Sequence, residues 1–84
     1  MSRHAIALTG GRELVVGWDP PLQTFFAIVR APEQDQPELW VGTDLHELYE
    51  LDDLARALGR AELAHHLTPE LGLALERDRE ENRA

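Results

Sequence analysis

The chain has 84 residues, no cysteine and a formal net charge of −8, which limits it to one small domain. The lack of cysteine excludes disulfides and thiolate metal sites, and the negative charge disfavours direct contact with nucleic-acid phosphates. The longest uninterrupted apolar run, residues 25–29, is far shorter than the ~20 residues of a membrane-spanning helix.

The first half of the chain predicts four β-strands. Over residues 3–9, His4, Ile6 and Leu8 alternate with other residues in a period of two, and Gly10-Gly11 suits a hairpin turn. Three further strands are expected at residues 14–18, 24–30 and 38–42, separated by Asp19-Pro20-Pro21 and by the proline-containing loop 31–37. Sequential strands with short connections favour an antiparallel meander.

The second half predicts two or three helices over residues 45–80. Apolar residues recur there at the three- and four-residue intervals of one buried helical face, at Leu45, Leu48, Leu51, Leu54, Ala55 and Leu58. We expect Gly59 to end this helix in a left-handed conformation, and a short helix to follow over residues 60–66. Thr68-Pro69-Glu70 has the residue types of a helix start, and the last helix runs to about residue 80, before a frayed tail at 81–84.

These elements predict a single α+β domain over residues 1–84. A four-stranded antiparallel β-meander fills residues 1–42, and two or three helices pack on one face of it. The strands are apolar on both faces, however. One face holds Leu14, Val16, Phe25, Ala27 and Val29 and is expected to pack on the helices. The other presents Val15, Phe26, Ile28 and Trp40.

Two interpretations of this second face stay open. The last helix and the loop 31–37 could wrap around it, or Phe26 could belong to the core under a twisted sheet. Alternatively, it is an apolar surface for self-association or for a partner, since monomers seldom leave such surfaces bare. We expect a homo-oligomer that uses Val15, Phe26, Ile28 and Trp40 as its apolar interface.

All of the net charge lies in residues 31–53, which hold eight acids and no Arg or Lys; the residues before sum to +1 and those after to −1. A localised negative field attracts basic surfaces. We therefore expect a protein partner with a basic surface, contacted by an acidic patch of Glu33, Asp35, Glu38, Asp44, Glu47 and Glu50. The alternatives are a solvated surface that maintains solubility, and mimicry of nucleic-acid charge.

One residue pair has the spacing of a metal site. Glu62 and His65 stand three residues apart, as in di-metal carboxylate bundles. Such a site needs a second pair, for which His46, Glu50 and Asp44 are the available contributors. Because this spacing is common by chance, we predict no metal and no cofactor.

No catalytic arrangement is recognisable. Asp52-Asp53 is the nearest to an acid–base pair, and adjacent acids of this kind fit a helix start better. A chain of this size also has little room to enclose a substrate pocket. We therefore predict that the protein is not an enzyme.

The run from Leu51 to Leu67 resembles the first part of a helix-turn-helix, with Ala55 inside the first helix and Gly59 at the turn. The resemblance implies a DNA-binding regulator. The chain departs from the motif at His65, where a buried aliphatic residue belongs, and Arg60 is the single cation of the would-be recognition helix. A helical hairpin that packs on the sheet is expected instead.

Taken together, these features predict a non-enzymatic protein–protein interaction module that self-associates through the apolar sheet face and contacts a basic partner through residues 31–53. The alternatives are a nucleic-acid-mimic inhibitor and, third, a helix-turn-helix-like DNA-binding regulator. Every basic residue is arginine, which suggests a GC-rich bacterial genome. Arg12 and Glu13 interrupt the N-terminal apolar stretch before a signal peptide could form, so a cytoplasmic location is expected.

Overall fold

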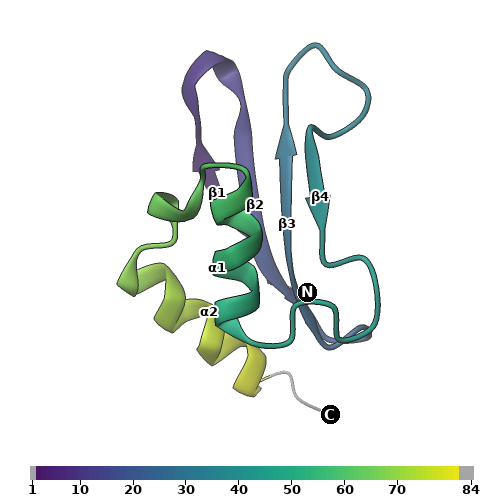
Figure 1. Ribbon diagram of the computed structural model, residues 1–84, viewed down its shortest axis with the longest axis vertical. Helices are drawn as coiled ribbons and strands as arrows, with labels where there is room; N and C mark the ends of the chain where they lie inside the picture. Colours follow the sequence, from purple (N-terminus) through teal and green to yellow (C-terminus); the bar gives the residue numbers. More distant parts are fainter. Residues whose placement is uncertain (1, 82–84) are drawn as a thin grey trace.

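The computed structural model describes residues 2–81 and shows a four-stranded antiparallel sheet followed by two α-helices (Figure 1). The strands are β1 (His4–Ala7), β2 (Glu13–Asp19), β3 (Thr24–Arg30) and β4 (Leu39–Val41). The helices are α1 (Leu51–Arg60) and α2 (Pro69–Glu81), and the short 3₁₀ turns are η1 (Thr9–Gly11) and η2 (Ala64–His66). The α+β class and the meander order β1-β2-β3-β4 are confirmed. Of the expected frayed tail, Glu81 ends α2 and residues 82–84 lie outside the described residues.

The strand register defines two faces of the sheet. One row of paired residues crosses all four strands through Ile6, Leu14, Val29 and Leu39. The neighbouring row crosses through Ala5, Val15, Ile28 and Trp40. Because successive side chains of a strand point to opposite faces, the two rows lie on opposite sides. We call the side with Trp40 the second face.

The main hydrophobic cluster joins the sheet to both helices. It contains Leu14, Val16, Trp18, Phe25, Ala27 and Val29 of the strands, Leu48, Leu54, Ala57 and Leu58 of the segment 48–58, and Leu75 of α2. Trp18 is 1% exposed and meets Phe25 edge to face, with ring centroids 5.0 Å apart. Each such buried side chain contributes about 1.5–3 kcal/mol of hydrophobic stabilisation.

The segment between β4 and α1 is not helical, although the leucine spacing predicted a helix from residue 45. The Leu48 amide donates to Thr24 Oγ1 at 2.7 Å, and the Phe25 amide donates to the Leu48 carbonyl at 2.8 Å. These bonds to β3 draw the backbone of Leu48 out of a helical path, while Leu45 is 63% exposed. The predicted start of the helix is therefore wrong, and α1 begins at Leu51.

The predicted end of α1 at Gly59 is also wrong. The helix continues through Arg60, and the residue with left-handed backbone is Glu62, whose φ is 61°. The Leu63 amide donates to the Leu58 carbonyl at 2.8 Å, and the Glu62 amide donates to the Gly59 carbonyl at 3.1 Å. This is a Schellman motif with glutamate at the position that glycine usually takes. The turn η2 replaces the short helix predicted over residues 60–66.

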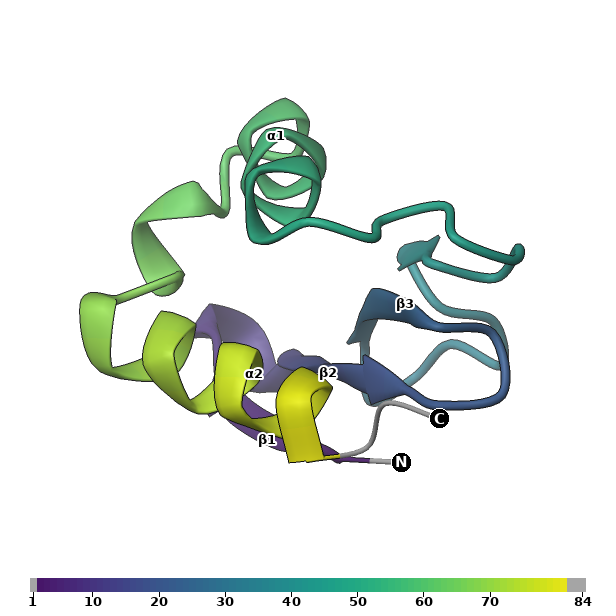
Figure 2. The ribbon, with the colours of Figure 1, turned by 90° about the horizontal axis from the view of Figure 1, so that it is seen from below.

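The helix α2 begins as predicted, since Thr68 Oγ1 accepts a hydrogen bond from the Leu71 amide at 3.2 Å. Figure 2 shows this helix beside β1 and β2, with α1 set apart from it. His4 of β1 and Asp78 of α2 connect the two elements, with Nε2 and Oδ2 2.7 Å apart. The last helix is thereby attached to the first strand of the sheet.

Candidate interaction surfaces

The four residues of the predicted apolar interface lie on one face of the sheet, and three of them are buried within the single chain. Val15, Phe26 and Ile28 form a separate hydrophobic cluster and are only 3%, 4% and 7% exposed within the single chain. The ring of Phe26 lies over Gly17, where an added Cβ would come within 2.8 Å of two ring carbons. Trp40 differs from the other three, because it is 60% exposed. The accessible apolar surface on this face is therefore centred on Trp40.

A groove of about 330 Å³ runs over the second face beside Trp40. Its lining includes three large apolar residues, Phe26, Ile28 and Trp40, and three charged residues, Arg3, Asp19 and Arg30. Arg30 is also the cross-strand partner of Glu13. Two cations and two acids thus lie on or beside this face and balance one another. These four charges therefore add no repulsion between two copies whose second faces meet.

The acidic patch expected from residues 31–53 is divided in space. Glu33 and Asp35 lie in the loop between β3 and β4, whereas Asp44, Glu47 and Glu50 follow β4. Figure 1 shows the two loops at opposite ends of β4. At about 3.3 Å per residue, the three residues of β4 separate them by roughly 10 Å, about one Debye length at physiological ionic strength. The charges form two smaller fields at the two ends of one strand.

Half of the expected patch residues are bound to other parts of the chain. Glu38 pairs with Arg12 at 3.1 Å, and Glu50 pairs with Arg79 at 3.2 Å. The Glu47 carboxylate accepts hydrogen bonds from three consecutive backbone amides shortly before it, at 3.1–3.2 Å. Of the six expected patch residues, Glu33, Asp35 and Asp44 have side chains that form no hydrogen bond or ion pair with any residue in 2–81. These three remain available to a partner.

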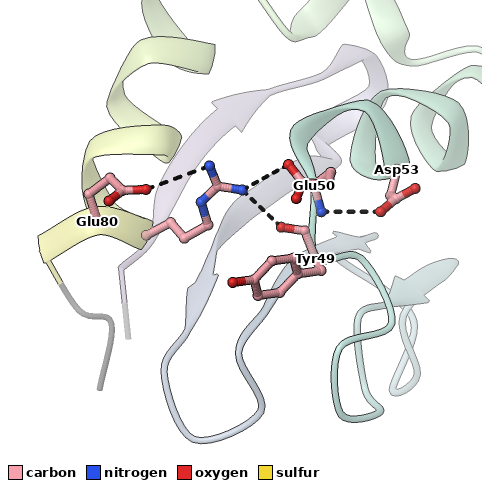
Figure 3. Close-up of polar contacts among 5 residues, drawn as sticks. Tyr49, Glu50, Asp53 and Glu80 are labelled. Atoms are coloured by element: carbon pink, nitrogen blue, oxygen red, sulfur yellow. Dashed lines mark hydrogen bonds and ion pairs between the residues drawn. The ribbon is translucent and has the colours of Figure 1, made fainter.

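Arg79, near the end of α2, is a structural residue. Its side chain is 15% exposed, and its guanidinium lies 5.8 Å from the ring centroids of Phe25 and Tyr49. It donates to the Tyr49 carbonyl at 3.1 Å, and the Glu50 amide in turn donates to Asp53 at 3.1 Å (Figure 3). The alternating charges of residues 76–83 contain no signal that singles out this arginine.

The metal-site spacing does not form on a helix. Glu62 occupies the left-handed position after α1, and His65 lies in η2. Of the proposed second contributors, His46 lies with its Nε2 3.1 Å from Gln23 Oε1, and Glu50 is paired with Arg79. Within residues 2–81, no group of three or more His, Asp or Glu side chains is arranged to hold a metal ion.

The helix-turn-helix resemblance ends with α1. The positions of the would-be second helix hold a turn and η2, and the next α-helix begins only at Pro69.

In the pair Asp52-Asp53, the Asp53 carboxylate accepts a hydrogen bond from the Glu50 amide, which is the role of an acid in the first turn of a helix.

Besides Leu45, one exposed apolar residue was not predicted from the sequence, Leu73 of α2, which is 67% exposed. It borders a groove of about 430 Å³ between α1 and α2. Its position two residues from both Leu71 and Leu75 was the available signal, because residues two apart on a helix point in nearly opposite directions.

Comparison of the chain with protein-family models, curated proteins and solved structures finds no match. No helix within residues 2–81 has the length and apolar character needed to cross a membrane.

Proposed function

We propose that this chain is a non-enzymatic protein–protein interaction module that self-associates through its second face. The observation that carries the proposal is the exposed Trp40 beside a groove with Phe26 and Ile28 at its base. Tryptophan is enriched among the residues that dominate binding energy, especially where it meets an apolar pocket. A second copy offers both the tryptophan and the groove.

The organisation of the core supports this choice of face. Leu54, Leu58 and Leu75 of the helices all belong to the main cluster, and the cluster of the second face contains strand residues alone. In the proposed arrangement the helices pack on the opposite face, so the second face is available to another molecule. Its balanced charge adds nothing to the repulsion between two chains of −8.

The second part of the proposal is a basic partner that contacts the two acidic loops at the ends of β4. The free side chains of Glu33, Asp35 and Asp44 support it, and β4 is an edge strand of the sheet. Reversing these three acids to arginine is expected to slow partner capture, because opposite charges accelerate encounter. Glu47 and Glu50 are unsuitable for this test, since their carboxylates hold the backbone and Arg79.

Self-association is tested by sedimentation velocity from low to high micromolar concentration. We expect the average molar mass of the wild type to rise with concentration, and Trp40→Ala to lower it at every concentration by weakening association about tenfold or more. Leu45→Ala is the matched control, because Leu45 is equally exposed at 63% but lies outside this face. An unchanged mass curve for Trp40→Ala, or a wild type that remains monomeric throughout, would refute the proposal.

A further inference from the structure

The exposed side of α2 has an apolar centre next to a groove. Leu73 is the most exposed of the large apolar side chains in the described chain. The groove beside it is lined by Leu51 and Ala55 of α1 and Gly72 of α2, together with the acids Asp52 and Glu76. Gly72 keeps this groove open, because an added Cβ would lie 3.3 Å from Leu51 Cδ2. An apolar side chain from another molecule can therefore enter between the two helices.

Two opposite charges flank Leu73 on the same side of the helix. Glu70 precedes it by three residues and Arg77 follows it by four. At 100° per residue, both side chains point within about 60° of Leu73. Both are exposed, and neither forms a hydrogen bond or an ion pair with any residue in 2–81. Glu70 and Arg77, without internal partners, therefore lie on one side of Leu73, and the exposed acids Glu76 and Glu80 lie on its other side, within about 60° of it.

We propose that this stripe is a second self-association surface, in which α2 packs antiparallel against α2 of another copy with the two Leu73 side chains at the centre. Glu70 lies about 4.5 Å from Leu73 along the helix axis and Arg77 about 6 Å from it in the other direction, at 1.5 Å per residue. A twofold axis through the centre therefore places Glu70 of each copy opposite Arg77 of the other. Both ion pairs form at once.

The charge pattern identifies the second copy as the occupant. A parallel arrangement would set Glu70 against Glu70 and Arg77 against Arg77, which is repulsive. An unrelated partner would need the same acid–leucine–arginine spacing in reverse, whereas a second copy supplies it by symmetry. The pair Glu70 and Arg77 adds no net charge to the contact, whose other charges are the exposed acids Glu76 and Glu80.

The expected contact is weak. A helix of 13 residues is about 20 Å long, and a contact of this length is at the small end of specific interfaces. Dissociation in the micromolar range is therefore expected, with each exposed ion pair changing the dissociation constant by up to about fivefold.

A charge-swap cycle tests the contact. We expect Glu70→Arg and Arg77→Glu each to raise the dissociation constant about tenfold, because each places like charges together at both symmetric positions. The double variant E70R/R77E restores the wild-type constant, since the pairs are re-formed with their signs exchanged. Arg60→Glu is the control for Arg77→Glu, as it changes the net charge by the same amount and sign at an exposed site on α1. All variants are measured by sedimentation equilibrium at low salt, with circular dichroism to verify the fold.

The cycle is run in the Trp40→Ala background, so that its outcome is separate from that of the second face. Dimers in this background that the single variants weaken and the double variant restores would establish the α2 contact. A monomeric Trp40→Ala chain at high micromolar concentration would overturn it, as would a double variant no better than the single ones. Restoration together with an unchanged mass for Trp40→Ala would support the α2 contact and refute self-association through the second face.

Discussion

Replacing Gly59 by alanine is expected to raise the free energy of unfolding, because this glycine lies inside α1. Its φ is not positive, and an added Cβ would have no neighbouring heavy atom within 4 Å. The left-handed residue after the helix is Glu62, with φ of 61°, where glycine avoids a steric cost that other residues bear. The reciprocal change, Glu62→Gly, is therefore also expected to stabilise the fold.

The magnitudes follow from the two backbone positions. Alanine in place of glycine inside a helix contributes roughly 0.5–1 kcal/mol. At Glu62, glycine removes about 1 kcal/mol of left-handed strain and loses roughly half of it through the greater freedom of the unfolded chain. The double variant G59A/E62G should then gain about 1–1.5 kcal/mol. For a domain of this size, that raises Tm by roughly 4–12 °C.

Urea unfolding followed by far-UV circular dichroism measures these changes, at one fixed protein concentration because self-association alters apparent stability. Gly72→Ala is the matched control: it is also a helical glycine, but its Cβ would lie 3.3 Å from Leu51 Cδ2. Crowding there should offset the gain in helix propensity. A loss of about 1 kcal/mol on Gly59→Ala would show instead that Gly59 is the left-handed residue, and the reasoning about the helix end would fail.

Two further stability predictions concern the β-sheet. Thr24→Val should lower the free energy of unfolding by about 1–3 kcal/mol, because the buried Thr24 hydroxyl accepts a hydrogen bond from the Leu48 amide at 2.7 Å and donates one to the Phe25 carbonyl. Thr43→Val, at an exposed position, should change Tm little. Equal effects of the two substitutions would contradict this role of Thr24. Gly42→Ala should abolish the cooperative unfolding transition, because its φ is 84° and its Cβ would overlap the Phe25 carbonyl oxygen. Gly10→Ala, also at positive φ but in open space, should cost only about 1 kcal/mol; similar losses would refute the steric argument.

The candidate surfaces were predictable in part. The apolar character of both faces of β2 and β3 predicted that Val15, Phe26, Ile28 and Trp40 would gather on one side, and the register brings them there. Their exposure was not predictable, because it depends on how neighbouring side chains pack over them. The number of acids in residues 31–53 predicted one acidic patch, but these acids lie in two loops at opposite ends of β4.

Local sequence determined the elements whose signals need no partner. Alternating apolar residues, the turn glycines and the proline breaks are enough for the four strands, and β3 has the predicted bounds of residues 24–30. Thr68 and Pro69 likewise mark the start of α2. These signals act within a few residues, since each depends on local backbone geometry and on local hydrogen bonds.

The tertiary structure decided where α1 begins and ends and which charges remain free. Leu48 leaves the helical pattern because Thr24 and Phe25 take its backbone hydrogen bonds. Arg79 is partly buried because it packs and bonds against Tyr49 and Glu50. Both contacts join residues more than twenty positions apart. A local pattern cannot encode them, because the energy of such a bond depends on the partner that folding brings near.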